Sequence, residues 1–313
     1  MSNPRFRTIF MGTPDFAVPG LEALLQAPDL EIVGVFTQTD KPVGRQQKLT
    51  PPPIKEIALK NKLKIFQPEK IKNEVETISS LKPDLIIVIA YGKIIPPTIL
   101  NIPKYGCLNV HASLLPKYRG AACLNAPIIN GEPETGLTIM KIDAGLDTGP
   151  ILRQAIIKLT GLETLEELHD ILAKKSAEIL VPTIHDWLAG KIILQNQDDS
   201  QASYVKMITK EDGRLNWQEP AVKIERLIRG FNPWPGTFSK IGQQTLKIIS
   251  VDYEILNINQ YKAGTIFLKN GRMAIQCGQN SLVILKLQLE GKKIMTAEEF
   301  LRGNKSFVGQ VLE

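Results

Sequence analysis

The first half of the chain alternates short apolar runs with segments of helical composition. Five near-continuous apolar runs, bounded by Gly, Pro or Asp, predict buried strands: Phe6–Met11, Glu31–Thr37, Asp84–Ala90, Cys107–His111 and Leu137–Ile142. Helices are predicted at Pro14–Gln26, Ile54–Lys62, Val75–Leu81, Gly120–Asn130 and Thr164–Ala189. Strands that alternate with helices are typical of the α/β class, so we predict a doubly wound, mostly parallel, Rossmann-like sheet.

The pattern changes in the second half. Residues 191–207 are largely polar, which predicts a linker between a first domain at 1–190 and a second at 208–313. After a helix at Val222–Phe231, five short runs predict strands: Gly236–Ile241, Leu246–Val251, Gly264–Leu268, Arg272–Cys277 and Leu282–Leu289. Asn270-Gly271 is a strong hairpin signal, and Thr296–Leu301 predicts a short capped helix. We therefore predict that the second domain is a small β-barrel with peripheral helices, for which an OB-like barrel is a candidate.

Composition narrows the class of protein. The 313 residues, 43% of them hydrophobic, suit two globular domains. No apolar run approaches the roughly 20 residues that cross a bilayer, and the N-terminal residues are too few and too polar for a signal peptide. The three cysteines cannot all pair and lack metal-ligand spacing, so we expect a cytoplasmic protein with no metal and no membrane contact. The net charge of +6 permits an anionic partner such as RNA without requiring one.

The candidate chemistry lies at the end of one predicted strand. Asn109 and His111 are two residues apart, so both side chains project from the same face, and the carboxyl ends of such strands hold ligands. A carboxylate follows in a glycine-flanked loop, as either Asp143 or Asp147. Asp143 is placed to cap the turn after its own strand, so Asp147 is preferred. An amide, an imidazole and a carboxylate together favour acyl-type catalysis, while a core histidine bonded to a backbone carbonyl is the alternative.

Two loops carry further information about ligands. Met11–Phe16 lacks the spaced glycines that bring a backbone close to a dinucleotide, which argues against a nicotinamide or flavin cofactor. Lys41–Leu49 is a basic, glycine-containing insert. It is either a solvated loop or an arm that contacts a polyanion.

Six segments, spread over most of the chain, carry a family pattern: Phe10–Pro19, Asp40–Arg45, Asn109–Gly120, Thr138–Pro150, Lys210–Trp217 and Arg229–Gly236. They resemble the methionyl-tRNA formyltransferase family. The Asn109-x-His111 element and the Asp147 loop are shared by the wider folate-dependent formyltransferases, whereas the basic insert and the second-domain segments are specific to the tRNA enzyme. The chain departs from the family at Cys123-Leu124-Asn125, where Pro-Ile-Gln is common.

The resemblance implies transfer of a formyl group from 10-formyltetrahydrofolate to the α-amine of methionyl-initiator tRNA, by a monomer without a metal. It implies that Asn109, His111 and Asp147 are catalytic. The folate contacts that it implies are Ser113, Leu114, Leu115 and Pro116. It also implies tRNA contacts at Arg45 and Lys48 and a second domain that holds the tRNA backbone.

Two rival functions stay open on the sequence. One is another folate-dependent formyltransferase or a formyl-folate hydrolase, acting on a sugar amine, on glycinamide ribonucleotide or on water. The other is a non-enzymatic RNA-binding protein with a vestigial α/β domain, which would tolerate replacement of His111.

Overall fold

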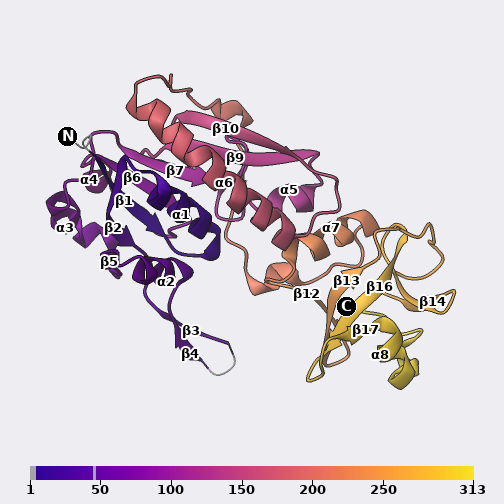
Figure 1. Cartoon of the computed structure of the whole chain (residues 1–313). Coiled ribbons are helices and arrows are strands. Elements are labelled where there is room, and N and C mark those ends of the chain that lie inside the picture. The colour runs from indigo at the N-terminus through magenta and orange to yellow at the C-terminus, as the bar shows by residue number, and fades with distance from the viewer. Residues whose placement is uncertain (1–4, 45–46) are drawn as a thin grey trace. The chain divides into compact units, whose positions relative to one another are not determined.

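The computed structural model describes residues 5–44 and 47–313, which form two compact units (Figure 1). Unit 1 consists of the residues up to Cys123, Thr135–Ile157 and His169–Val205. Unit 2 consists of Leu124–Glu134, Lys158–Leu168 and Lys206–Glu313. Within the described residues, no helix is both long and apolar enough to cross a membrane.

The central sheet of unit 1 has the strand order β10-β9-β7-β6-β1-β2-β5. Its strands are β1 (Phe6–Gly12), β2 (Leu30–Phe36), β5 (Ile65–Phe66), β6 (Leu85–Ile89), β7 (Cys107–His111), β9 (Glu134–Lys141) and β10 (Ile151–Lys158). The five neighbouring strands β7, β6, β1, β2 and β5 pair in parallel, whereas β9 runs antiparallel to β7. The predicted mostly parallel, doubly wound sheet is confirmed, with an antiparallel partner for the strand that carries His111.

Helices cover both faces of this sheet. They are α1 (Val18–Gln26), α2 (Pro53–Lys60), α3 (Val75–Ser80), α4 (Pro97–Leu100) and the long α6 (Leu165–Leu188). Ile86 of β6 packs in one cluster with Ile78 of α3 and Ile99 of α4. Ile89 of β6 projects from the other face of the sheet, because side chains alternate along a strand. Its side chain packs against Gly20 of α1 so closely that a β-carbon on residue 20 would collide with it. Alternate residues of one apolar strand therefore support two helical layers, as in doubly wound folds.

The segment after β7 differs from the prediction. The helix expected from Gly120 begins five residues later, as α5 (Asn125–Asn130). Arg119–Gly120 instead forms the short strand β8, which pairs in parallel with β11 (Tyr204–Val205). Gly120 has φ +106°, a conformation outside the helical region. Residues 191–207, predicted as a linker, thus include a strand that pairs with unit 1.

Unit 2 carries an antiparallel sheet of strand order β12-β13-β16-β15-β14, with β17 paired to β16. Its elements are α7 (Ala221–Phe231), β12 (Thr237–Ile241), β13 (Gln244–Val251), β14 (Ile266–Lys269), β15 (Arg272–Gln276), β16 (Ser281–Leu289), β17 (Met295–Thr296) and α8 (Ala297–Gly303). Asn270 and Gly271 join β14 to β15 with positive φ at both residues, as the hairpin signal predicts. Thr296 and Glu299 form the capping box expected at the start of α8.

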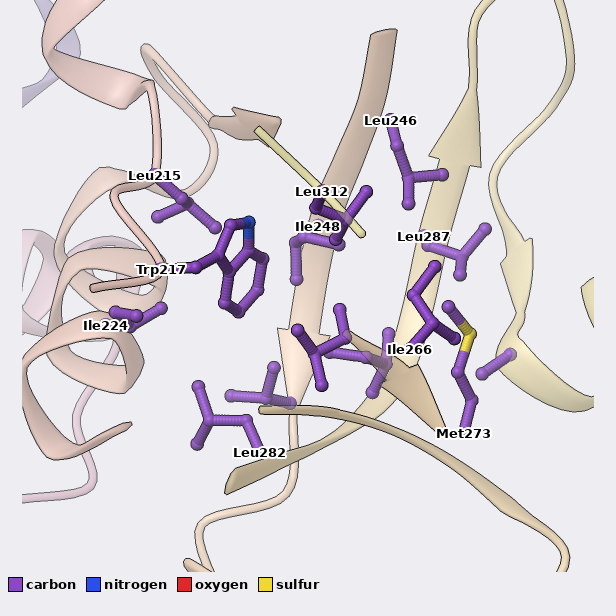
Figure 2. Close-up of a cluster of buried hydrophobic side chains, with 14 of the residues drawn as sticks. Leu215, Trp217, Ile224, Leu246, Ile248, Ile266, Met273, Leu282, Leu287 and Leu312 are labelled. Carbon is purple, nitrogen blue, oxygen red and sulfur yellow. The ribbon is translucent and has the colours of Figure 1, made fainter. Parts of the chain in front are cut away.

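The C-terminal residues close this sheet. Ile266 of β14 donates its N–H to the carbonyl of Gln310, and Leu312 donates to that of Gly264. On the other side, Glu313 donates to the carbonyl of Lys240 in β12. Leu312 then lies in the core together with Trp217, Ile248 and Leu287 (Figure 2). The last residues therefore join the two edge strands of the sheet, which supports the predicted barrel.

Candidate active site

Strand β7 places Asn109 and His111 on one face of the sheet. Asn109 pairs with Met140 of β9 and His111 with Thr138, so the register is regular across both positions. Asn109 is half-buried, and its amide makes no hydrogen bond within the described part of the chain. His111 is 5% exposed. The strand therefore presents an unused amide beside a buried imidazole.

Both nitrogens of His111 have an oxygen nearby. Nε2 lies 2.9 Å from the carbonyl oxygen of Tyr118 and, because a carbonyl only accepts, must carry a proton. Nδ1 lies 3.7 Å from Oδ2 of Asp147. This distance is too long for a hydrogen bond, so Asp147 acts on the imidazole through its charge. The sequence left two alternatives for His111, a core histidine bonded to a backbone carbonyl and a catalytic histidine beside a carboxylate. Both arrangements occur, because Nε2 bonds to the Tyr118 carbonyl and Nδ1 faces Asp147.

The surroundings raise the pKa of His111. Burial by itself lowers this pKa, but a hydrogen bond and charge interaction with Cys123, the charge of Asp147 and the Tyr118 carbonyl outweigh it and raise it to about 9. The imidazole is therefore charged at neutral pH. Cys123 is the first of the three positions at which the chain departs from the family pattern, and it lies against the candidate catalytic imidazole.

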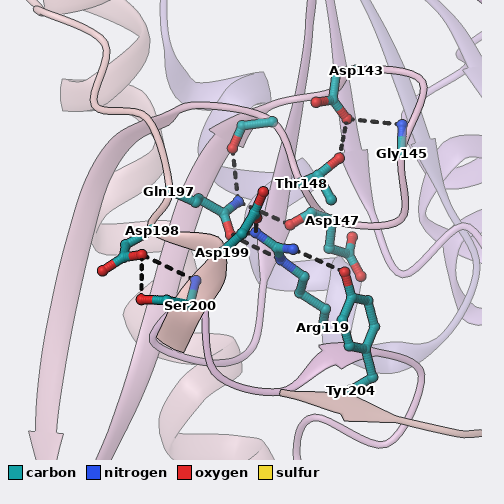
Figure 3. A network of polar contacts seen from close by, with 11 residues as sticks. Arg119, Asp143, Gly145, Asp147, Thr148, Gln197, Asp198, Asp199, Ser200 and Tyr204 are labelled. Atoms are coloured by element: carbon teal, nitrogen blue, oxygen red, sulfur yellow. Dashed lines mark hydrogen bonds and ion pairs between the residues drawn. The ribbon is translucent and has the colours of Figure 1, made fainter. Parts of the chain in front are cut away.

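The Asp147 loop reaches His111 by a route that the sequence pattern did not predict. Since β9 is antiparallel to β7, its carboxyl end lies beside the amino end of β7, and the loop must turn back toward His111. Asp143 stays within this loop, where it accepts hydrogen bonds from the N–H of Gly145 and the hydroxyl of Thr148 (Figure 3). Asp147 accepts the N–H of Gly120 at 2.9 Å. The structure thus brings Asp147, and not Asp143, to the histidine.

The segment predicted to contact folate is held rigidly beside the site. Ser113 is fully buried, and its hydroxyl donates to the carbonyl of Lys117 at 2.6 Å. Leu115 is buried too, and its N–H donates to Thr138 Oγ1 at 3.0 Å. Leu114 and Pro116 are half-buried. Among the four residues predicted to contact folate, these two are partly exposed, whereas Ser113 and Leu115 are buried.

The basic insert forms a hairpin of β3 (Lys41–Val43) and β4 (Lys48–Thr50), which projects from the sheet of unit 1 (Figure 1). Lys48 is exposed on β4. Arg45 lies outside the described residues. The structure therefore places one of the two predicted tRNA contacts on a projecting surface.

Two residues at the site were not predicted. Arg119 is almost fully buried and donates to the side-chain oxygen of Gln197, whose amide nitrogen in turn donates to the Asp147 loop (Figure 3). A charged residue eight positions after His111 was an available signal for Arg119. Gln197 gave none, because it lies in a polar stretch with the composition of a linker. In the part of the chain that the structure describes, no group of three or more His, Cys, Asp or Glu side chains could hold a metal ion.

Solved structures share this fold. An N-formyltransferase from Helicobacter canadensis, in complex with folinic acid and dTDP-3-aminofucose, superposes with a TM-score of 0.66 at 21% identity, covering 89% of this chain and 98% of that one. HypX from Aquifex aeolicus, in complex with tetrahydrofolic acid, superposes with a TM-score of 0.65 at 14% identity, over 97% of this chain and 47% of that one. At these identities, the likeness shows the fold alone.

Sequence comparison gives the family. The family model described as formyl transferase matches residues 5–184, and that described as formyl transferase, C-terminal domain, matches residues 207–305. The methionyl-tRNA formyltransferase of Trichlorobacter lovleyi is 45% identical over 311 residues, 98% of this chain and 97% of the relative. That of Clostridium novyi is 43% identical over 312 residues, 98% of this chain and 100% of the relative. The resemblance drawn from the motifs is thus confirmed, and the chain belongs to the methionyl-tRNA formyltransferase family.

Proposed function

We propose that this protein transfers the formyl group of 10-formyltetrahydrofolate to the α-amine of methionyl-initiator tRNA, as a cytoplasmic monomer. The observation that carries the proposal is that Asn109 and His111 lie on one face of β7, with Asp147 3.7 Å from His111. The near full-length likeness to methionyl-tRNA formyltransferases supports the choice of acceptor.

Asn109 supplies the hydrogen bond for the oxyanion. When the amine nitrogen bonds to the formyl carbon, negative charge develops on the formyl oxygen. The amide of Asn109 is held by a strand and has no other partner in the described chain, so it can donate to this oxygen without first breaking a bond. One donor of this kind typically contributes about 3 kcal/mol to the transition state.

His111 carries the proton. The amine loses one proton as its bond to the formyl carbon forms, and the donor's nitrogen gains one as its bond to that carbon breaks. His111 is charged at neutral pH, so it can give its proton to the leaving nitrogen and then take the amine's proton, which restores its charge. Asp147 supports the charged form throughout.

The remaining predicted contacts divide between the two substrates. Leu114 and Pro116 offer surface to the folate beside the catalytic strand. Residues 208–313, proposed as the tRNA-binding domain, contain 15 Lys and Arg against 10 Asp and Glu, so they carry +5 of the net charge of +6. This excess suits a phosphate backbone, and the β3–β4 hairpin with Arg45 and Lys48 is proposed to approach the acceptor end.

The purified full chain tests the proposal. With 10-formyltetrahydrofolate, we expect formylation of methionyl-initiator tRNA and much slower formylation of methionyl-elongator tRNA, measured as the transfer of a radiolabelled formyl group to acid-precipitable tRNA. A dTDP-amino sugar and water serve as competing acceptors. Transfer to the sugar or release of formate without transfer to tRNA would overturn the proposed acceptor, and no turnover of the donor at all would overturn the enzymatic role.

A further inference from the structure

The Asp147 loop is held from behind by one glutamine. The side-chain nitrogen of Gln197 donates to the carbonyl of Asp147 at 2.8 Å and to that of Gly149 at 2.7 Å (Figure 3). Both protons of one amide group are thus used on two backbone oxygens of the same loop. These bonds act on the backbone that carries the carboxylate, not on the carboxylate itself.

Arg119 determines which way this amide faces. Its Nε and Nη2 donate to the side-chain oxygen of Gln197 at 3.1 and 2.8 Å. Because a guanidinium only donates, the amide oxygen must face Arg119 and the amide nitrogen must face the loop. A rotation of the amide by 180° would place donors against donors at one end and acceptors against acceptors at the other.

Arg119 is itself fixed on every side. Arg119 is 1% exposed. Its Nη1 donates to the Tyr204 hydroxyl at 2.9 Å, and Nη2 also donates to Asp199 Oδ1 at 2.7 Å. Its backbone belongs to β8, which pairs with Tyr204–Val205. The next residue, Gly120, donates its N–H to the Asp147 carboxylate. Gln197 therefore holds the backbone of the loop, and the N–H of Gly120 holds the side chain of Asp147.

The loop needs such support because its conformation is unfavourable. Asp147 has φ +55°, in the left-handed region that non-glycine residues seldom occupy. Gly149 lies so close to the carbonyl of Lys141 that a β-carbon would collide with it. Without bonds from outside the loop, Asp147 can relax to a commoner backbone geometry and turn its carboxylate away from His111.

We propose that Arg119 and Gln197 are positioning residues for catalysis, which hold Asp147 beside His111 through the backbone of its loop. This inference rests on the proposed role of Asp147 in formyl transfer. Gln197, although it lies in a stretch with the composition of a linker, then supports the catalytic site. Since neither side chain is proposed to touch a substrate, their loss should lower kcat and leave the KM values nearly unchanged.

The test is Gln197→Glu in the full chain. Glutamate keeps two acceptors for Arg119 but has no proton to donate to the loop. Gln201→Glu is the matched control, because Gln201 lies four residues away, is exposed and donates only to Asp198 in the described structure. We expect a loss of kcat of roughly 10- to 100-fold for Gln197→Glu, the size of a misplacement of about 1 Å, and no loss for Gln201→Glu.

Two further readouts separate positioning from general structural damage. The titration midpoint of the His111 ring, followed by NMR in the unliganded protein, should fall in Gln197→Glu and stay unchanged in Gln201→Glu. In the double variant Asp147→Asn with Gln197→Glu, kcat should equal that of Asp147→Asn alone, because Gln197 then has no carboxylate to position. Additive losses, or an unchanged His111 titration, would overturn the proposal.

Folding failure is also informative. Gln197→Ala serves as a second variant, and thermal melting reports whether each protein is folded. If neither variant folds, Gln197 is a stability residue and the proposal is overturned. If the unmodified chain fails to formylate tRNA, the proposed function fails, while the NMR titration still tests whether Gln197 controls the environment of His111.

Discussion

His111 and Asp147, 3.7 Å apart, are both hydrogen-bonded to the three-residue segment Tyr118–Gly120. The carbonyl of Tyr118 accepts a hydrogen bond from His111 Nε2, and the N–H of Gly120 donates to Asp147 Oδ2, the same atom that faces His111. Tyr118 and Gly120 both have positive φ. The imidazole and the carboxylate therefore have their spacing set by backbone groups and not by a direct bond between them.

The first prediction concerns the ionisation of His111. Its pKa is raised to about 9, so the ring should stay charged through neutral pH in an NMR titration. Asp147→Asn removes one of the charges that raise it, and the midpoint should move down toward the ordinary value of about 6.5. A midpoint that does not move in Asp147→Asn would show that the carboxylate has no influence on the imidazole.

The same shift predicts how stability depends on pH. A group whose pKa is higher in the folded than in the unfolded state stabilises the fold in full below the unfolded value, near 6.5, and this stabilisation is lost as pH rises through about 9. The difference in melting temperature between the protein and His111→Gln should therefore be larger at pH 6.5 than at pH 9.5. His185→Gln, at an exposed position, is the matched control. An equal difference at both pH values would contradict the assignment.

The third prediction tests the oxyanion role of Asn109. Asn109→Ala should lower kcat by roughly 100- to 1000-fold, the cost of one lost donor, while the KM for tRNA changes little. Steady-state kinetics with a filter-binding measurement of tRNA affinity separate the two effects. A variant in which KM rises and kcat is retained would reassign Asn109 to substrate binding.

We expect Cys123 to make the site sensitive to thiol reagents. It is partly exposed, whereas Cys107 and Cys277 are buried and burial raises the pKa of each of their thiols to about 12. N-ethylmaleimide should therefore label Cys123 first, as mapped by mass spectrometry, and abolish formylation because the adduct lies against His111. Because Cys123 helps to raise the pKa of His111, Cys123→Ala should lose part of its activity but resist the reagent. Equal inactivation of Cys123→Ala would locate the sensitive thiol elsewhere.

The β3–β4 hairpin should contribute to tRNA binding through charge. Lys48→Ala is expected to raise the KM for tRNA several-fold and to reduce the slope of log affinity against log salt by about 1, with kcat unchanged. Lys60→Ala, on the exposed end of α2, is the control. A salt slope that is the same in both variants would leave the hairpin as a solvated loop.

The sequence by itself determined many of the elements, including the strand proposed to carry the chemistry, but not β8, β10 or β11. Cys107–His111 forms a strand with the predicted bounds, because a continuous apolar run between turn residues is a local signal. The Asn270-Gly271 hairpin and the capped helix at Thr296 are local as well, since their geometry depends on residues three or four positions apart. The family resemblance rests on the same short segments.

Only the tertiary structure decided which distant residues meet. The choice of Asp147 over Asp143 depends on an antiparallel β9 and a loop that turns back, and neither leaves a trace in hydrophobic periodicity. Gln197 is polar in a polar stretch, and its proposed role could be inferred only because the fold buries Arg119, 78 positions earlier, against it. Closure of the second sheet by its last four residues is likewise a long-range pairing. Periodicity reports the environment of each side chain, whereas hydrogen bonds between segments far apart in the chain depend on where the whole fold brings them.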